Sequence, residues 1–358
     1  PAWATEQDSV SKIIITIILL GLIILLHEFG HFITAKAFKM PVIEFAIGMG
    51  PKLISIKKGE TNYSIRALPL GGFVNIDGMQ IEDDPSKVVK NGFNSQSPVK
   101  RFVVLVAGVV MNFLSAILVI YVLVLGFKEV PSKFIPTIVN EVSEKSYIKD
   151  KIIPGDKIVS LDGKSVKNLK DLSIITEEIA SKGYKDTEIQ VEVIRNNKVV
   201  KENIKLMRDE KNQSIVRLGI TTELPKKIGV LEGVKIAFYT FGQYLKMMVD
   251  GLGMLVTGKV SMNEVTGPVG LTSVVGQVVN QAGYFALLNL FVLLSINIGL
   301  MNLLPIPALD GGRLIFVLLE LVGIKVNKKI EEKLHFVGIV LLMGLMLLII
   351  SNDIRKFL

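Results

Sequence analysis

The stretch LLHEFGHFI, residues 25–33, places three ionisable side chains at the end of an apolar run. His27 and His31 are four positions apart, so they share one face of a helix, and Glu28 stands beside the first of them. H-E-x-x-H on a helix is typical of zinc hydrolases, in which two imidazoles bind Zn²⁺ and the glutamate acts as a general base. The pattern therefore indicates metal-assisted hydrolysis.

The alternative is a histidine pair whose hydrogen bonds are satisfied by neighbouring helices. An ionisable side chain in the middle of a membrane span costs a few kcal/mol on insertion scales, and a bound dication gives these three groups a reason to lie there. The chain contains no cysteine, which excludes thiolate zinc sites, disulfides and cysteine nucleophiles. Any metal must therefore be held by His, Asp or Glu.

A catalytic zinc has three protein ligands and one open position, so a third ligand must come from another part of the chain. Asp310, in NLLPIPALDGGR, follows an apolar run that Pro305 and Pro307 interrupt. Its alternative role is the N-cap of the next helix, a common position for aspartate. The only other histidine, His335, begins a later apolar run, where we interpret it as a polar tip at the membrane interface. Asp310 is therefore the predicted third ligand.

Composition predicts the elements that must position these residues. Half of the 358 residues are hydrophobic, the mean hydropathy is +0.50, and the apolar residues gather in a few runs, as in membrane spans. The first run, Ile13 to Leu26, reaches span length only if its helix continues through HEFGH to about Phe38. The predicted transmembrane segments are residues 12–38, 101–127, 284–304 and 334–351.

The remaining segments differ in character. Residues 1–11 are polar and are left out of the fold. Residues 40–100 combine a polar loop with two short strands, Ile47–Ile56 and Asn62–Ile76, punctuated by glycine and proline. Residues 128–224 alternate as strands around one amphipathic helix, and residues 225–283 contain an interfacial amphipathic helix and a glycine-rich loop. Residues 305–333 join the last two spans.

The predicted fold class is therefore a mainly α-helical polytopic membrane protein. It has four transmembrane helices, a membrane-associated β-hairpin region and one inserted α+β domain. The net charge is +8, and lysines concentrate in the short third–fourth connection, which the positive-inside rule assigns to the cytoplasm. The inserted domain and both termini are then extracytoplasmic. No nucleic-acid-binding motif accompanies the basic charge.

These features resemble the site-2 protease family of intramembrane zinc metalloproteases. HEFGH lies late in the first span, and NLLPIPALDGG matches the family pattern N-x-x-P-x-x-x-x-D-G through Asn302, Pro305, Asp310 and Gly311. Four spans with a PDZ-like domain between the second and third resemble the bacterial regulator of sigma-E protease group, including RasP-type members. Further matches are GMGPKL, LPLGGFV, VAGVVMNF and GPVGL.

The resemblance implies a role for each matching residue. The hairpin segment GMGPKLISI is implied to present a strand edge to an unwound substrate, since a peptide bond inside a helix is shielded and its freed backbone groups need new partners. The implied site residues are His27, His31 and Asp310 as zinc ligands, Glu28 as general base and later proton donor, and Asn112, Asn302, Gly48, Met49 and Gly50 as groups near the substrate.

The implied activity is that of a zinc metalloendopeptidase that cleaves inside the transmembrane segments of single-span proteins already trimmed outside, such as anti-sigma factors or signal-peptide remnants. The implied location is a bacterial cytoplasmic (inner) membrane, with the active site near the cytoplasmic side. The stretch KSYIKDKII departs from the small-residue pattern of many PDZ-like relatives. The competing hypotheses are a zinc transporter or sensor that uses the same ligands, although no internal repeat supports transport, and a non-catalytic scaffold.

Overall fold

The computed structural model describes residues 2–79, 89–209, 212, 215–259, 267–324 and 326–357. Two compact units divide the chain, Pro1–Ile120 with Phe241–Leu358, and Tyr121–Thr240. The helices are α1 (Ala2–Ala37), α2 (Pro98–Phe127), α3 (Leu169–Ser181), α4 (Val230–Val256), α5 (Pro268–Ala282), α6 (Leu287–Leu303), α7 (Asp310–Leu321) and α8 (Lys328–Phe357). The strands are β1 (Val42–Lys58), β2 (Thr61–Ile76), β3 (Val139–Val142), β4 (Lys157–Leu161), β5 (Lys164–Ser165), β6 (Ile189–Arg195), β7 (Lys198–Ile204), β8 (Met207–Arg208), β9 (Val216–Arg217) and β10 (Ile220–Thr222).

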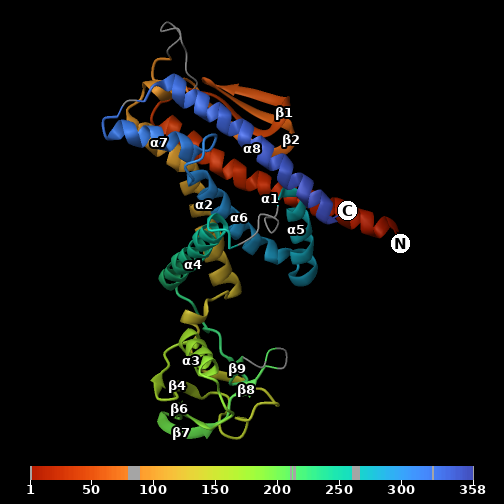
Figure 1. Ribbon diagram of the computed structural model, residues 1–358, viewed down its shortest axis with the longest axis vertical. Helices are drawn as coiled ribbons and strands as arrows, with labels where there is room; N and C mark the ends of the chain where they lie inside the picture. Colours follow the sequence, from red (N-terminus) through yellow and green to blue (C-terminus); the bar gives the residue numbers. More distant parts are fainter. Residues whose placement is uncertain are drawn as a thin grey trace. The chain divides into compact units, whose positions relative to one another are not determined.

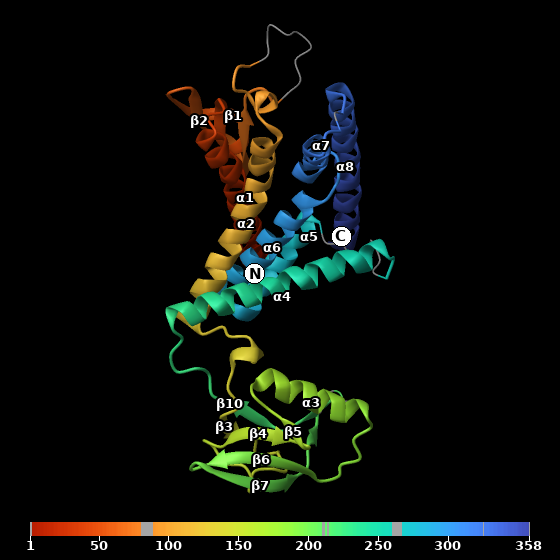
Figure 2. The ribbon, with the colours of Figure 1, turned by 90° about the vertical axis from the view of Figure 1, so that its left-hand side faces the viewer.

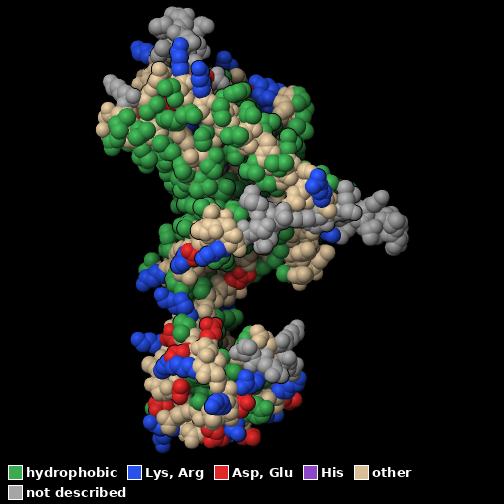
Figure 3. Space-filling model, in the orientation of Figure 1, with side chains coloured by type: hydrophobic (Ala, Val, Ile, Leu, Met, Phe, Trp, Pro, Cys, Tyr) green, Lys and Arg blue, Asp and Glu red, His purple; other side chains and the backbone are tan. Residues whose placement is uncertain are grey.

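The predicted fold class is confirmed. Within the described ranges, four helical segments are long and apolar enough to cross a membrane: Val10–Ala37, Pro98–Phe127, Tyr284–Leu303 and Lys329–Arg355. Figure 3 shows the broad apolar surface over the helical unit, whereas the inserted α+β domain carries mixed acidic and basic side chains. An apolar exterior of this kind suits contact with lipid tails.

Helices α1 and α2 approach closely beside the H-E-x-x-H turn. A Cβ atom added at Gly30 would lie 2.2 Å from the carbonyl oxygen of Ala107 and 3.0 Å from the Cα atom of Gly108. Small residues permit such an approach in membranes, where association depends on close van der Waals packing. The histidine-bearing turn of α1 is therefore held against the backbone of α2.

Strand β1 is longer than the predicted strand Ile47–Ile56, whereas β2 begins only one residue before the predicted strand Asn62–Ile76. They contain 17 and 16 residues, and they lie beside α1 (Figure 1). Glu44 pairs with both Asn62 and Asn75, and the residues that follow it up to Ile47 also have partners on both sides. The bulges bend the two strands, so that residues 44–47 of β1 lie between the first part of β2 and the stretch Gly72–Asn75. In the described register, Gly72–Asn75 is therefore an outer strand that pairs with β1 on one side.

The segment 225–283 contains two helices, α4 and α5, where an amphipathic helix and a glycine-rich loop were predicted. Pro268 stands in the first turn of α5, a favourable position because its missing N–H would have no intrahelical partner. Parts of the loop predicted after β2, part of the glycine-rich stretch and Lys325 lie outside the described residues. Figure 2 shows α7 and α8 on the other side of their unit from α1, β1 and β2.

The inserted domain is built around a four-stranded antiparallel sheet of order β5-β4-β6-β7, with α3 packed on its core. Asn168 caps α3 by accepting a hydrogen bond from the N–H of Asp171. The carboxylate of Asp156, 1% exposed, accepts hydrogen bonds from Arg195 and from the N–H of Ile153. Burial raises the pKa of Asp156, but these hydrogen bonds outweigh it and hold the pKa below its ordinary value.

This pair gives a prediction for the stability of the inserted domain. Asp156→Asn should destabilise the domain by about 2 kcal/mol, because a buried hydrogen-bonded charge is lost while Arg195 keeps its own. Since the folded-state pKa is lowered, the contribution is present above the unfolded value of about 3.9 and is lost as pH falls through the folded value. Hydrogen exchange of β4 and β6 in the full chain measures the change.

The matched control is Glu144→Gln, since Glu144 is 92% exposed in its ion pair with Lys149. It removes the same charge from the surface and should leave exchange in β4 and β6 unchanged. Equal protection in the Asp156→Asn and Glu144→Gln variants would contradict the assigned role of Asp156.

Candidate metal centre

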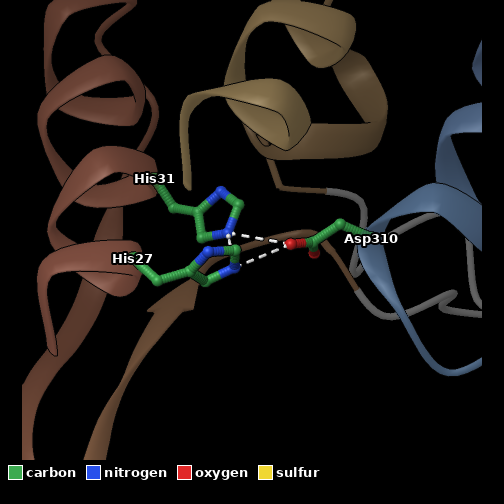
Figure 4. A group of neighbouring side chains, drawn as sticks. All are labelled: His27, His31 and Asp310. Carbon is green, nitrogen blue, oxygen red and sulfur yellow. Dashed lines mark hydrogen bonds and ion pairs between the residues drawn. The ribbon is translucent and has the colours of Figure 1, made fainter. Parts of the chain in front are cut away.

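The structure brings together the three residues predicted as metal ligands. His27 and His31 project from α1 and are 5% and 6% exposed, and Asp310 is the first residue of α7. The Oδ2 atom of Asp310 lies 2.9 Å from the Nε2 atom of His27 and 3.2 Å from that of His31 (Figure 4). The two Nε2 atoms are 3.2 Å apart. Three ligand atoms from positions up to 283 residues apart therefore meet at one point.

The orientation of the imidazoles fits a cation. The Nδ1 atom of His31 lies 2.7 Å from the carbonyl oxygen of Val104, which can only accept, so Nδ1 carries the proton and the Nε2 lone pair faces Asp310. The Nδ1 atom of His27 is buried with no hydrogen-bond partner among the described residues. Two imidazole nitrogens and one carboxylate oxygen are a ligand set used by catalytic Zn²⁺ sites, so the residues present fit the metal.

A glycine in α2 leaves the space that the imidazoles occupy. A Cβ atom at Gly108 would lie 2.5 Å from Nε2 of His31 and 2.7 Å from Cε1 of His27. Real side-chain atoms do not approach so closely, so any larger residue must displace the rings. Sequence reasoning included Gly108 in the stretch VAGVVMNF without a role. Its signal, one small residue in a span, is too common to identify it.

The loop between α6 and α7 delivers Asp310. The loop is tight, because a Cβ atom at Gly311 would lie 2.2 Å from the carbonyl oxygen of Leu304 and one at Gly312 would lie 2.4 Å from that of Ile306. The N-cap position of α7 is occupied by Leu309. Asp310 is therefore not the helix cap that was the alternative, and its carboxylate points at the imidazoles instead (Figure 4).

Glu28 lies beside the three ligands in a cavity of about 190 Å³. Its Oε2 atom accepts a hydrogen bond of 3.0 Å from the N–H of Val74 in the outer strand of β2. Water takes about 30 Å³ in the liquid, so the cavity has room for several molecules. Its lining residues are Glu28, His31, Val74, Ile76, Met79, Ala308, Asp310, Arg313 and His335.

Two charged or ionisable cavity residues were not predicted to belong to the site. Burial lowers the pKa of the Arg313 guanidinium, an effect that Glu331 and Asp310 oppose. His335 is half-buried against the cavity, and its Nδ1 atom accepts a hydrogen bond from the N–H of Ala308. The structure thus differs from the interpretation of His335 as an interfacial tip, because the loop before α7 folds back onto α8.

The residues predicted near the substrate are placed differently from one another. Asn112 is fully buried one turn after Gly108 on α2, and its side-chain amide has no partner among the described residues. Asn302 is half-buried near the end of α6. The cavity lining does not include Gly48, Met49 or Gly50, which lie in the bulged part of β1.

Two histidines on a helix that can span a membrane meet a carboxylate at the start of α7, and a glutamate lies beside them. This arrangement is typical of a membrane metalloprotease site. The sequence profile of peptidase family M50 matches residues 15–345. The chain therefore belongs to peptidase family M50, the site-2 protease family, and is a zinc metalloprotease.

Two relatives align with nearly the whole length of this chain. "Putative zinc metalloprotease FN1322" of Fusobacterium nucleatum is 46% identical and covers 96% of this chain and 98% of its own. "Regulator of sigma-W protease RasP" of Bacillus subtilis is 28% identical and covers 97% of this chain and 99% of its own. Among solved structures, the PDZ domain of the SdrC-like protein of Listeria innocua is 21% identical over 25% of this chain and 93% of its own, with a TM-score of 0.22.

Gly108 supplies a direct test of the centre. Gly108→Ala should lower the zinc content of the purified protein and reduce its proteolytic activity at least tenfold, because the added methyl group lies where the imidazoles must be. Elsewhere in a helix the same change is mildly favourable, since alanine has the higher helix propensity. Zinc per chain, measured by elemental analysis, and cleavage of a model substrate check the result.

Gly126→Ala in the same helix is the matched control, since a Cβ atom there has nothing within 4 Å. It should keep zinc and activity. Full zinc content and activity in Gly108→Ala would show that the imidazoles do not occupy the positions described.

Proposed function

We propose that His27, His31 and Asp310 hold the zinc ion and that Glu28 is the general base in the hydrolysis of peptide bonds inside transmembrane segments. The observation that carries the proposal is the meeting of three ligand atoms, beside Glu28, where a helix apolar enough to cross a membrane meets the start of α7. When bound, zinc polarises a carbonyl group and lowers the pKa of water to near 7. The chain's own residues supply position, proton transfer and access.

Glu28 moves the proton in this proposal. Its carboxylate lies in the cavity with Asp310 and His31, and the N–H of Val74 holds one of its oxygens. The other oxygen can take a proton from the attacking water and later pass it to the leaving amine, as general acid–base catalysis requires. This role needs an ionised carboxylate and a fixed orientation.

The outer strand of β2 binds the substrate. A transmembrane helix must unwind before its peptide bonds can be attacked, and the freed N–H and C=O groups then need partners. Strand addition supplies them. The stretch Gly72–Ile76 is suited to this role because it lies at the edge of the sheet and contributes Val74 and Ile76 to the cavity. The role predicted for Gly48, Met49 and Gly50 stays a prediction, and these residues lie in the bulged part of β1 in the same sheet.

Asn112 and Asn302 supply polar groups near the same substrate. The buried amide of Asn112 has no partner among the described residues, and an unpaired amide is costly in an apolar interior unless a bound group satisfies it. A backbone group of the extended substrate can do so. Asn302 is assigned the same role because it lies at the end of α6, just before the loop that carries Asp310.

The substrates in this proposal are single-span membrane proteins that have already lost their outer domains, such as anti-sigma factors or signal-peptide remnants. The lysine-rich third–fourth connection supports an orientation with the cavity near the cytoplasmic side of a bacterial inner membrane and the PDZ-like domain outside. In this orientation the PDZ-like domain restricts access by bulky ectodomains. The name of the Bacillus subtilis relative, a regulator of sigma-W protease, supports regulated intramembrane proteolysis.

Glu28→Gln tests the proposed base. The amide keeps the shape of the side chain but cannot accept the proton, so cleavage of a model single-span substrate in detergent should fall by about 10²–10⁴-fold. Zinc content should be unchanged because Glu28 is not one of the proposed ligands. Glu60→Gln, which alters a carboxylate paired with Lys36 at the surface, is the control and should cleave normally. Wild-type cleavage by Glu28→Gln would refute the assignment.

The same variant can identify substrates. Glu28→Gln, expressed in place of the active protein, should retain uncleaved single-span proteins, which mass spectrometry of the purified complex would name. Recovery of soluble proteins alone would contradict the proposed substrate class.

A further inference from the structure

The loop that delivers Asp310 has a strained backbone. Ala308, two residues before Asp310, has φ +86°, a left-handed conformation that residues with a Cβ atom rarely adopt. Such a conformation persists only where the surroundings impose it. The question is which contacts hold the loop.

Helix α8 contacts two consecutive residues of this loop, Pro307 and Ala308. The Nδ1 atom of His335 accepts a hydrogen bond of 3.1 Å from the N–H of Ala308. One turn later, a Cβ atom at Gly338 would lie 2.4 Å from both the Cβ and the carbonyl oxygen of Pro307. Positions three apart lie on one face of a helix, so α8 presents one acceptor and one flat surface to the loop.

The rest of α8 has few contacts that could explain its position. Only 6% of its most apolar window is buried. Between residues 332 and 341, every residue is exposed except His335, which is half-buried, and Gly338, which is buried. At the other end of the helix, Asp353 accepts hydrogen bonds from the N–H groups of Gly267 and Gly270. The loop contact is therefore specific and does not follow from general helix packing.

We propose that α8 is a brace for the Asp310 loop and that His335 is a positioning residue for Asp310. His335 holds Ala308 in its left-handed conformation, and Gly338 lets α8 approach Pro307, so that the carboxylate of Asp310 reaches the imidazoles. The Nδ1 atom of His335 accepts the hydrogen bond from the N–H of Ala308, so this atom is not free to bind the metal itself. This inference rests on the proposed role of Asp310 as a zinc ligand.

Zinc retention by the full chain in detergent tests the brace without relying on activity. The purified variants are titrated with a competing chelator, and released zinc is measured with a metallochromic dye. His335→Ala should release zinc at a chelator concentration at least tenfold lower than the wild type, as expected when the group that orients a ligand is lost. His335→Asn should restore most retention, because its Oδ1 atom stands two bonds from Cβ, as Nδ1 does, and can accept the same hydrogen bond.

A second substitution addresses the strain directly. Glycine adopts positive φ without penalty, so adding Ala308→Gly to His335→Ala should recover at least part of the lost retention. A role of His335 in general folding would not be rescued in this way. No recovery in either His335→Asn or the double variant would overturn the proposal, as would wild-type retention in His335→Ala.

The glycine provides an independent test should His335→Ala fail to fold. Gly338→Ala should weaken zinc retention, because the methyl group forces α8 away from Pro307. Gly344→Ala in the same helix is the matched control, since its Cβ atom would have nothing within 4 Å. Equal retention in these two variants would overturn the brace.

Asp310→Asn separates this inference from the proposed function. Weak zinc retention in Asp310→Asn together with normal retention in His335→Ala and Gly338→Ala would reject the brace but keep Asp310 as a ligand. Normal retention in Asp310→Asn would reject the ligand assignment itself.

Discussion

Ionisable groups inside an apolar helix bundle are tolerated when they satisfy one another, and this constraint governs the architecture. Each such group costs a few kcal/mol at membrane depth when alone, yet His27, His31 and Asp310 place their ligand atoms within 4.8 Å of one another. A dication held by two neutral imidazoles and a carboxylate, as proposed, would remove most of that cost. The helices must then bring segments that are distant in the sequence to one point, and small errors in their positions would separate the ligand atoms.

Small residues make that convergence possible. Gly30 lets α1 approach α2, Gly108 leaves room for the imidazole rings, and Gly311 with Gly312 lets the loop before α7 turn back on itself. Each stands where a single methyl group would collide with backbone or with a ligand ring. The glycines of the helical unit thus follow from the geometry of the metal centre as much as from membrane packing.

The sequence predicted the meeting of His27, His31 and Asp310 better than it predicted the segments around them. H-E-x-x-H spacing fixes a shared helix face, and Asp310 directly follows an apolar run that prolines interrupt, so the meeting of His27, His31 and Asp310 could be predicted without coordinates. Hydropathy likewise predicted the spans. The early start of β1 at Val42 was not predicted, because Gly48 and Gly50 suggest the irregular end of a strand, whereas here they occupy bulges within a continuous strand. The contact of His335 with Ala308 depends on how a loop folds back, which periodicity does not encode.

X-ray absorption spectroscopy of the purified zinc-loaded protein tests the central claim most directly, because it counts the atoms around the metal. The account predicts one zinc per chain with only nitrogen and oxygen neighbours at about 2.0–2.2 Å and outer scattering from two imidazoles. The chain has three histidines. A spectrum that requires three imidazoles would place His335 on the metal in place of Asp310 and contradict the account, as would a protein that binds no zinc.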